Sequence, residues 1–212
     1  FPGNLKIKSS DFRHVYATKS GEVIETHTQG GNFLLEDVTM NKFGPNSALF
    51  VNLGVDIRLK NVTFEDNLMN HHCLSSSPHC NRTQIVEHWE KETNQVGGGA
   101  IRILNVMGAV MEQVVFKKLV AINGGAILFT ANREWSLQLE QISLTSLQFI
   151  DCQAIHNGGA IYADGPHRIN IEKSSFRDNY ALRSTLNSRW MGEGGAIYYS
   201  NEHCQNKLSI SN

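Results

Sequence analysis

The amino-acid sequence predicts an all-β protein, and within that class a right-handed parallel β-helix of about six to seven coils with loop insertions. Composition and two repeated motifs support this fold. The 212 residues include 18 glycines but only 4 prolines, and the apolar residues come in short bursts, which is typical of many short strands joined by tight turns. A repeat unit of roughly 26 residues has an apolar edge that it can bury only by stacking on its neighbours.

The first motif is Gly-Gly-Ala-Ile, which we expect at the corners of the coils. Paired glycines suit a corner that needs positive φ or a close approach of two backbones, and the alanine suits a narrow place inside the coil. Two weaker counterparts, Gly21–Ile24 and Ser47–Phe50, fall where the period expects them. The four full copies are Gly98–Ile101, Gly124–Ile127, Gly158–Ile161 and Gly194–Ile197, at spacings of 26, 34 and 36 residues.

The second motif is an apolar string that alternates with period two on either side of a bend and usually ends on Phe. Such alternation predicts strands with one face toward the core. The six strings begin at Leu5, Phe33, Ile57, Ala109, Ile142 and Ile169, and Leu208 opens a seventh. If the coils are in register, the last positions stack into one internal column made of Phe12, Met40, Phe64, Phe116, Phe149 and Phe176.

Residues beyond the minimum period predict loops that leave the coil at its corners. We expect one β-helical segment over residues 1–212, as a piece of a longer chain, with insertions at 67–96, 131–141 and 181–193. Phe64 and Phe116 are 52 residues apart, twice the basic period. The first insertion is therefore either one loop or contains a degenerate coil.

The alternation of Gly-Gly-Ala-Ile with Phe-x-x-Asn resembles the repeats of chlamydial polymorphic outer membrane proteins, and similar repeats occur in large secreted proteins of protists and other microbes. The Phe-x-x-Asn half is intact at Phe64–Asn67 and Phe176–Asn179, altered at Phe149–Cys152 and lost at Phe116–Leu119. The resemblance implies a β-helical passenger on a cell surface, used in adhesion or as a display scaffold, with no catalytic residues to carry over.

The cysteines allow several interpretations. Cys73 and Cys80 lie in the first insertion among histidines, and a disulfide that closes a small ring is the expectation for a secreted loop. A zinc site and free thiols are the alternatives, although the spacing is not that of a standard zinc finger. Cys152 and Cys204 pair only if adjacent coils bring their corners together, and otherwise Cys152 is a small buried residue. We predict no resident metal and no cofactor.

Two further sets of residues are candidates for modification or contact. Asn61 and Asn81 begin Asn-x-Thr acceptor tripeptides for glycosylation, which also occur by chance. Three tryptophans lie in or beside the insertions, where amphipathic rings either contact partners or pack the loop onto the coil. They are Trp89, Trp135 and Trp190.

Carboxylates could instead make the chain an enzyme. Asp66, Asp151 and Asp178 each follow the repeated Phe by two residues, so Asp151 and Asp178 become neighbours if the coils are in register. Paired acids can divide acid and base work. Asp before Asn at a repeated turn also serves local hydrogen bonds, and His14 and Lys118 interrupt the array, which favours turn chemistry.

Charge and hydropathy exclude some classes of function. The 19 basic and 20 acidic residues nearly balance, with no basic run for nucleic acid, and no apolar run approaches the roughly 20 residues of a transmembrane helix. We expect a non-enzymatic structural or adhesive scaffold at the cell surface or outside the cell. Its expected partners are other protein chains, further coils of the same polypeptide, or glycans. The alternative is a secreted polysaccharide-active enzyme, a glycoside hydrolase or lyase, that uses Asp151 and Asp178.

Overall fold

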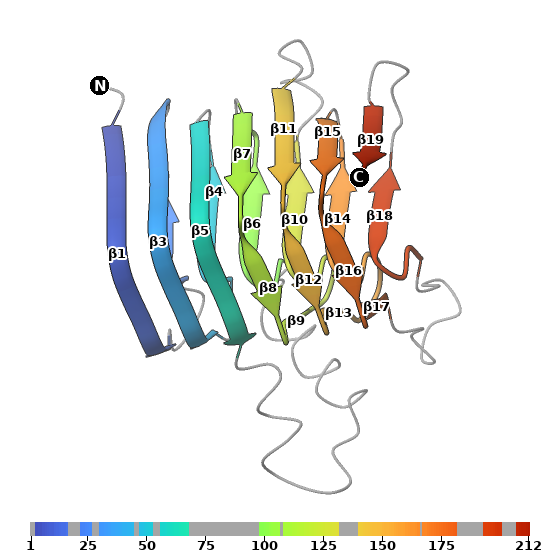
Figure 1. The fold of residues 1–212 in the computed structure, drawn as a ribbon, viewed down its shortest axis with the longest axis horizontal. Coiled ribbons are helices and arrows are strands. Elements are labelled where there is room, and N and C mark those ends of the chain that lie inside the picture. The colour runs from blue at the N-terminus through green and yellow to red at the C-terminus, as the bar shows by residue number, and fades with distance from the viewer. Residues whose placement is uncertain are drawn as a thin grey trace, which may run out of the picture.

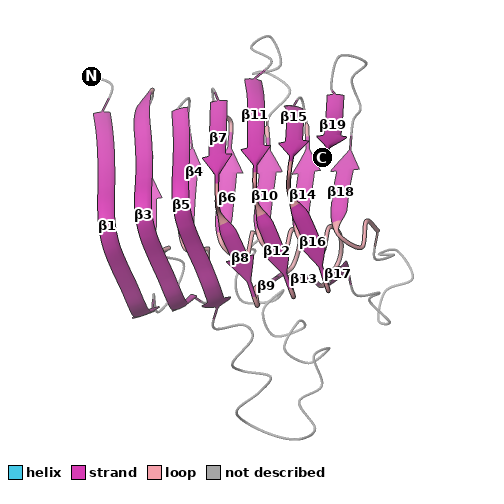
Figure 2. Cartoon of the chain, in the orientation of Figure 1, coloured by secondary structure: helices cyan, strands magenta, loops and turns pink. Residues whose placement is uncertain are grey.

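The computed structural model describes most of the repeat units of the chain. The described ranges are 3–16, 22–26, 30–44, 47–52, 56–67, 98–106, 108–131, 140–165, 167–181, 193–200 and 207–212. Within them the chain forms strands and turns and no helix (Figure 2). The described residues therefore include no helix that is long and apolar enough to span a membrane. The prediction of an all-β fold is confirmed.

The described residues form three parallel sheets, and the largest of these has ten strands. In its first three repeats each string is one long strand, whereas later strings divide at the bend into two strands. The long strands are β1 (Gly3–Tyr16), β3 (Gly31–Gly44) and β5 (Asp56–Asn67). The divided ones are β7 (Gly108–Glu112) with β8 (Val115–Lys117), β11 (Glu140–Thr145) with β12 (Gln148–Ile150), and β15 (His167–Glu172) with β16 (Ser175–Arg177), followed by β19 (Lys207–Ser211).

A second sheet of six strands lies behind the first in Figure 1, and its strands run in the opposite direction. Its strands are β2 (Ile24–Thr26), β4 (Leu49–Asn52), β6 (Ile101–Leu104), β10 (Ile127–Thr130), β14 (Ile161–Asp164) and β18 (Ile197–Ser200). A third sheet contains β9 (Val120–Ala121), β13 (Gln153–Ala154) and β17 (Tyr180–Ala181). From β7 onward, the chain passes from the first sheet to the third, then to the second, and returns to the first.

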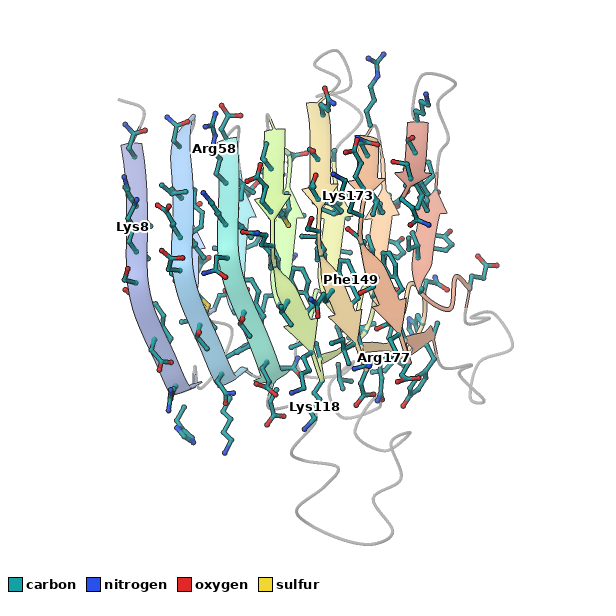
Figure 3. All side chains as sticks on the ribbon, in the orientation of Figure 1. Lys8, Arg58, Lys118, Phe149, Lys173 and Arg177 are labelled. Carbon is teal, nitrogen blue, oxygen red and sulfur yellow. The ribbon has the colours of Figure 1, made fainter. Side chains whose placement is uncertain are left out.

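The register of the first sheet places the expected phenylalanine column in the core. Phe12 pairs with Met40, and the pairing continues through Phe64, Phe116, Phe149 and Phe176 in successive repeats. The last four rings stack face to face, with centroids 5.4, 4.9 and 4.6 Å apart. Figure 3 shows Phe149 within this row. Because Phe64 pairs directly with Phe116, β5 adjoins β7 and β8 in the first sheet with no described strand between them.

The bend in every string comes from a residue with left-handed backbone. Leu59 and Val62 both point into the core although they are three residues apart, because Asn61 between them has φ of 51°. Non-glycine residues are uncommon in this region, where Asn and Asp are the best tolerated. The equivalent residues at the bend are Ser9, Asp37, Asn61, Gln113, Ser146 and Lys173, and a second set ends each string at His14, Lys42, Asp66, Lys118, Asp151 and Asp178.

One apolar core lies between the first and second sheets. Phe64 from the first sheet and Ile101 from the second are both fully buried in it. Burial falls at both ends of the row of repeats: Leu5 is 41% exposed and Ile210 is 59% exposed. The strands also extend slightly into the expected insertions. Asn67 is the last residue of β5, Glu140 and Gln141 lie in β11, and Ala181 lies in β17.

Candidate functional site

The Gly-Gly-Ala-Ile motifs form a repeated corner just before the strands of the second sheet. At this corner four consecutive backbone N–H groups donate to carbonyl oxygens of the next repeat. The N–H groups of Gly158–Ile161 donate to the oxygens of Glu193, Gly194 and Ala196 at 2.8 to 3.2 Å. The motifs at Gly98–Ile101 and Gly124–Ile127 make the same four bonds over the same range of distances. Each corner is therefore a clamp between neighbouring repeats, which we call the corner clamp.

The two glycines of the motif are needed for different reasons, and both agree with the expectation from the sequence. The first glycine has positive φ at every level, for example 60° at Gly124 and 66° at Gly158. The second glycine of the first three motifs has no space for a side chain. A Cβ on Gly125 would lie 2.1 Å from the carbonyl oxygen of Gly159 and 2.6 Å from the backbone nitrogen of Gln153. The glycine therefore lets the backbone of the next repeat approach closely.

Asn67 fixes a neighbouring corner through its side chain. It is 1% exposed, and its Nδ2 donates to the carbonyl oxygens of Val120 at 2.7 Å and Gly99 at 3.3 Å. Its Oδ1 accepts a bond of 3.1 Å from the Val120 N–H. Asn179 acts in the same way toward the preceding repeat, because it accepts from the Cys152 N–H and donates to the Phe149 carbonyl, both at 3.0 Å. The conspicuous Asn of Phe-x-x-Asn is thus a structural side chain that bonds the backbone between repeats.

Asp151 and Asp178 are neighbours across adjacent repeats, as the register predicted. The Asp151 N–H donates to the carbonyl oxygen of Arg177 at 3.0 Å, one residue before Asp178. The side chain of Asp178 is 77% exposed and lies 3.8 Å from the Arg177 guanidinium. The carboxylate of Asp151 accepts a bond of 2.9 Å from the Gln153 side chain. Both carboxylates therefore have local partners.

The column of acids is not continuous. Lys118 occupies the equivalent position between Asp66 and Asp151, and it lies at the same end of the first sheet as Arg177 in Figure 3. Asp66, Asp151 and Asp178 all have positive φ, between 52° and 63°. Within the described ranges, no three His, Cys, Asp or Glu side chains are grouped so that they could hold a metal ion. These positions therefore have the geometry of turn residues.

Cys152 is fully buried in the core and is a free thiol. Burial raises the pKa of the Cys152 thiol to about 12. Its Sγ lies 3.7 Å from the carbonyl oxygens of Phe116 and Ile150. It therefore has the environment of a small apolar residue, as one interpretation of the sequence expected.

The outer face of the first sheet carries charged side chains that pair between repeats. Lys8 forms an ion pair with Glu36, which raises the pKa of Lys8 and lowers the pKa of Glu36 through their shared hydrogen bond. Glu65 pairs with Lys117 at 2.7 Å. Exposed pairs of this kind contribute little stability but disfavour a shifted register, in which like charges would be opposite.

Two outward-facing tyrosines stack on the second sheet. The rings of Tyr162 and Tyr198 are parallel at 5.0 Å. Burial, followed by the nearby Asp164 carboxylate, raises the pKa of the Tyr162 phenol to about 12. The pair extends the stacking between repeats to the outer surface.

Asn61 is the one of the two predicted glycosylation residues that lies in the described ranges. It is exposed at the bend of β5, and its Nδ2 donates to the carboxylate of Asp37 at 2.7 Å. The remaining predicted site residues lie outside the described residues: Cys73, Cys80, Asn81, Trp89, Trp135, Trp190 and Cys204.

Comparison with protein families, with curated proteins and with solved structures found no match to this chain.

Proposed function

We propose that the three parallel sheets close into a right-handed β-helix, and that this rod is a non-enzymatic scaffold that presents loops for contact with proteins or glycans. The observation that carries the proposal is the repetition of the corner clamp. The same four bonds, the same two glycines and the same apolar columns recur from repeat to repeat, which is what a stacked solenoid requires.

The described residues on either side of the first insertion lie next to each other. Asn67 ends β5 and its Nδ2 lies 3.3 Å from the carbonyl oxygen of Gly99, so the two ends of the segment 68–97 are adjacent. A coil can therefore accept extra residues at this corner without moving its strands. Trp89 belongs to this segment, whereas Trp135 and Trp190 belong to the other two insertions, and all three are proposed contact residues.

A cell-surface or extracellular location fits the remaining features. Asn61 is an exposed acceptor at a turn, and the resemblance to chlamydial surface proteins and related secreted proteins points the same way. In such a location Cys73 and Cys80 would form the proposed disulfide. Expression through a eukaryotic secretory pathway, followed by peptide mass mapping, tests the glycan at Asn61 and Asn81 and the disulfide together. Unmodified asparagines and reduced thiols would contradict this part of the proposal.

The enzymatic alternative rests on the adjacency of Asp151 and Asp178. Their local partners, Gln153 and Arg177, and the exposure of Asp178 support a structural role instead. Release of reducing or unsaturated sugars from a panel of polysaccharides tests this directly. An activity that is lost in both Asp151→Asn and Asp178→Asn would replace the scaffold proposal.

The scaffold proposal is tested by removing one presented segment. We would replace residues 68–97 with a short Gly-Ser linker, because the ends of the segment already meet, and measure both folding and adhesion. The shortened chain should keep its β-type circular dichroism and cooperative unfolding. Beads coated with it should lose adhesion to immobilised matrix proteins and glycans that the intact chain binds. Loss of folding on deletion, or adhesion equal to that of the intact chain, would contradict the proposal.

A further inference from the structure

The last Gly-Gly-Ala-Ile motif, Gly194–Ile197, lies at the β18 end of the rod, in the same position relative to its strand as the motifs that form the corner clamps. At each earlier corner, the four backbone N–H groups of the motif donate to the next repeat. For Gly194–Ile197 the described residues supply no such acceptors. Gly194 nevertheless has the positive φ of the other corners, 64°. The Gly194 corner therefore has the backbone geometry of the earlier corners, without described acceptors for its N–H groups.

Gly195 shows the same feature sterically. The second glycines of the earlier corners, Gly99, Gly125 and Gly159, would each place a Cβ within 2.0 to 2.1 Å of a carbonyl oxygen in the next repeat. A Cβ on Gly195 would meet none of the described atoms within 4 Å. Among the described residues, none occupies the space beside Gly195 that the next backbone fills at the earlier corners.

The two ends of the rod differ in how they protect their edges. At the opposite end, β1 carries Lys6, Lys8 and Arg13, and charged residues of this kind discourage the addition of strands. At the β18 end, the strand Ile197–Ser200 has no charge, and Phe176 is only partly buried against the core. At this end β19 carries Lys207 and β16 carries Arg177, so the uncharged edge suited to strand addition is that of β18.

We propose that the β18 end of the rod binds one further coil of the same Gly-Gly-Ala-Ile repeat, starting from β19. β19 already holds the place of the first strand of such a coil, because Leu208 and Ile210 pair with Ile169 and Ile171 of β15. The carbonyl oxygens at the corner of the added coil accept from Gly194–Ile197, and its phenylalanine stacks on Phe176. The inference rests on the proposed coil architecture and identifies the chemistry of one partner of the rod.

The test extends the 212-residue chain after Asn212 with a copy of residues 147–165. Ser211 pairs with Glu172, which pairs with Thr145, so Asn212 takes the place of Ser146 and the copy enters in register. Four chains are compared by thermal unfolding: with and without the extension, each with Gly195 or with Gly195→Ala. A scrambled extension of the same composition is the control.

The extension should raise the Tm by several degrees in the chain with Gly195, because each stacked repeat adds its own interface. Gly195→Ala should leave the Tm of the 212-residue chain nearly unchanged but remove the gain from the extension. The proposal is overturned if the extension gives no gain, if the scrambled copy gives an equal gain, or if Gly195→Ala leaves the gain intact. Concentration-dependent association of the unextended chain that Gly195→Ala abolishes would assign the end to a second copy instead, and would also overturn it.

Failure of the docking inference can be told apart from failure of the proposed coil architecture. If the repeats do not stack as coils, Gly125→Ala inside the rod is harmless. If Gly125→Ala destabilises the chain while the extension has no effect, the rod stands and only the docking inference fails.

Discussion

Gly125→Ala and Gly195→Ala form a matched pair that measures how tightly the repeats stack. Both residues hold the second position of the Gly-Gly-Ala-Ile corner, and neither has positive φ. A Cβ at Gly125 would lie 2.1 Å from the Gly159 oxygen and 2.6 Å from the Gln153 nitrogen, whereas at Gly195 it meets no described atom within 4 Å. The same substitution therefore causes a backbone collision in one place and none in the other.

The magnitude follows from the distances. Relief of the collision requires the two backbones to separate by about 1 Å, since real Cβ contacts essentially never fall under 3.0 Å. A separation of that size breaks two bonds: the one from the Gly125 N–H to the Gly158 oxygen, which is 3.2 Å long, and the one from the Gln153 N–H to the Leu119 oxygen, which is 2.8 Å long. Two buried backbone bonds lost at roughly 1–2 kcal/mol each cost about 3 kcal/mol.

For a chain of this size, a loss of about 3 kcal/mol corresponds to a decrease of roughly 6–12 °C in Tm. Gly195→Ala should change the free energy of unfolding by no more than about 0.5 kcal/mol. The effect of alanine on the entropy of the unfolded chain is the same for both variants, so it cancels in the comparison. Thermal unfolding followed by circular dichroism measures both. Equal Tm values for the two variants would refute the reasoning.

Three further predictions concern the core. Phe149→Ala should lower the free energy of unfolding by about 3–5 kcal/mol, because the Phe149 ring stacks on a ring on each side. Phe176→Ala, at the partly buried end of the column, should lower it by less. Equal losses in denaturant unfolding would contradict the stacked column. Asn67→Leu should cost about 2–4 kcal/mol, because it leaves the Val120 N–H and carbonyl without their buried partner, and a neutral result would show that the side-chain bonds are dispensable. Cys152 holds its proton in the folded chain up to a pKa of about 12, whereas the unfolded thiol ionises near 9, so stability is unaffected below pH 9 and falls by up to about 1.4 kcal/mol per pH unit above it. Denaturant unfolding between pH 8 and 10, below the range in which the raised pKa of Tyr162 contributes, should show this decline, and Cys152→Ala should remove it. Identical pH profiles would contradict the assignment.

The sequence was sufficient to predict the all-β class, the register and the purpose of the glycines. These features share a cause: positions that stack from one repeat to the next must repeat in residue type, so Phe116, Phe149 and Phe176 identify one column and the Ile residues of the corners another. The two glycines could be assigned to positive φ and close approach because no other residue satisfies both requirements.

Other features were not predictable because they depend on which repeats become neighbours. The direct pairing of Phe64 with Phe116 across 52 residues could not be separated from a degenerate coil, since both satisfy the same period. The left-handed bends at Lys118 and Lys173 gave no signal, because lysine is not a typical turn residue and takes this conformation only where the flanking strands impose it. The interrepeat bonds of Asn67 were likewise hidden, although the Phe-x-x-Asn pattern marked the residue.

The most direct test of the stacked-coil account compares two engineered disulfides, each of which would join β5 to another strand of the first sheet. Lys60 and Glu112 are exposed and paired between β5 and β7, and Thr145 is the next residue in the same column. Adjacent parallel strands lie about 4.8 Å apart, within the reach of a disulfide, whereas strands two repeats apart lie near 9.6 Å, beyond its limit of about 7 Å. Under mild oxidation, Lys60→Cys with Glu112→Cys should give the linked peptide by mass spectrometry, and Lys60→Cys with Thr145→Cys should not. Failure of the first link, or formation of the second, would contradict the stacking of these repeats.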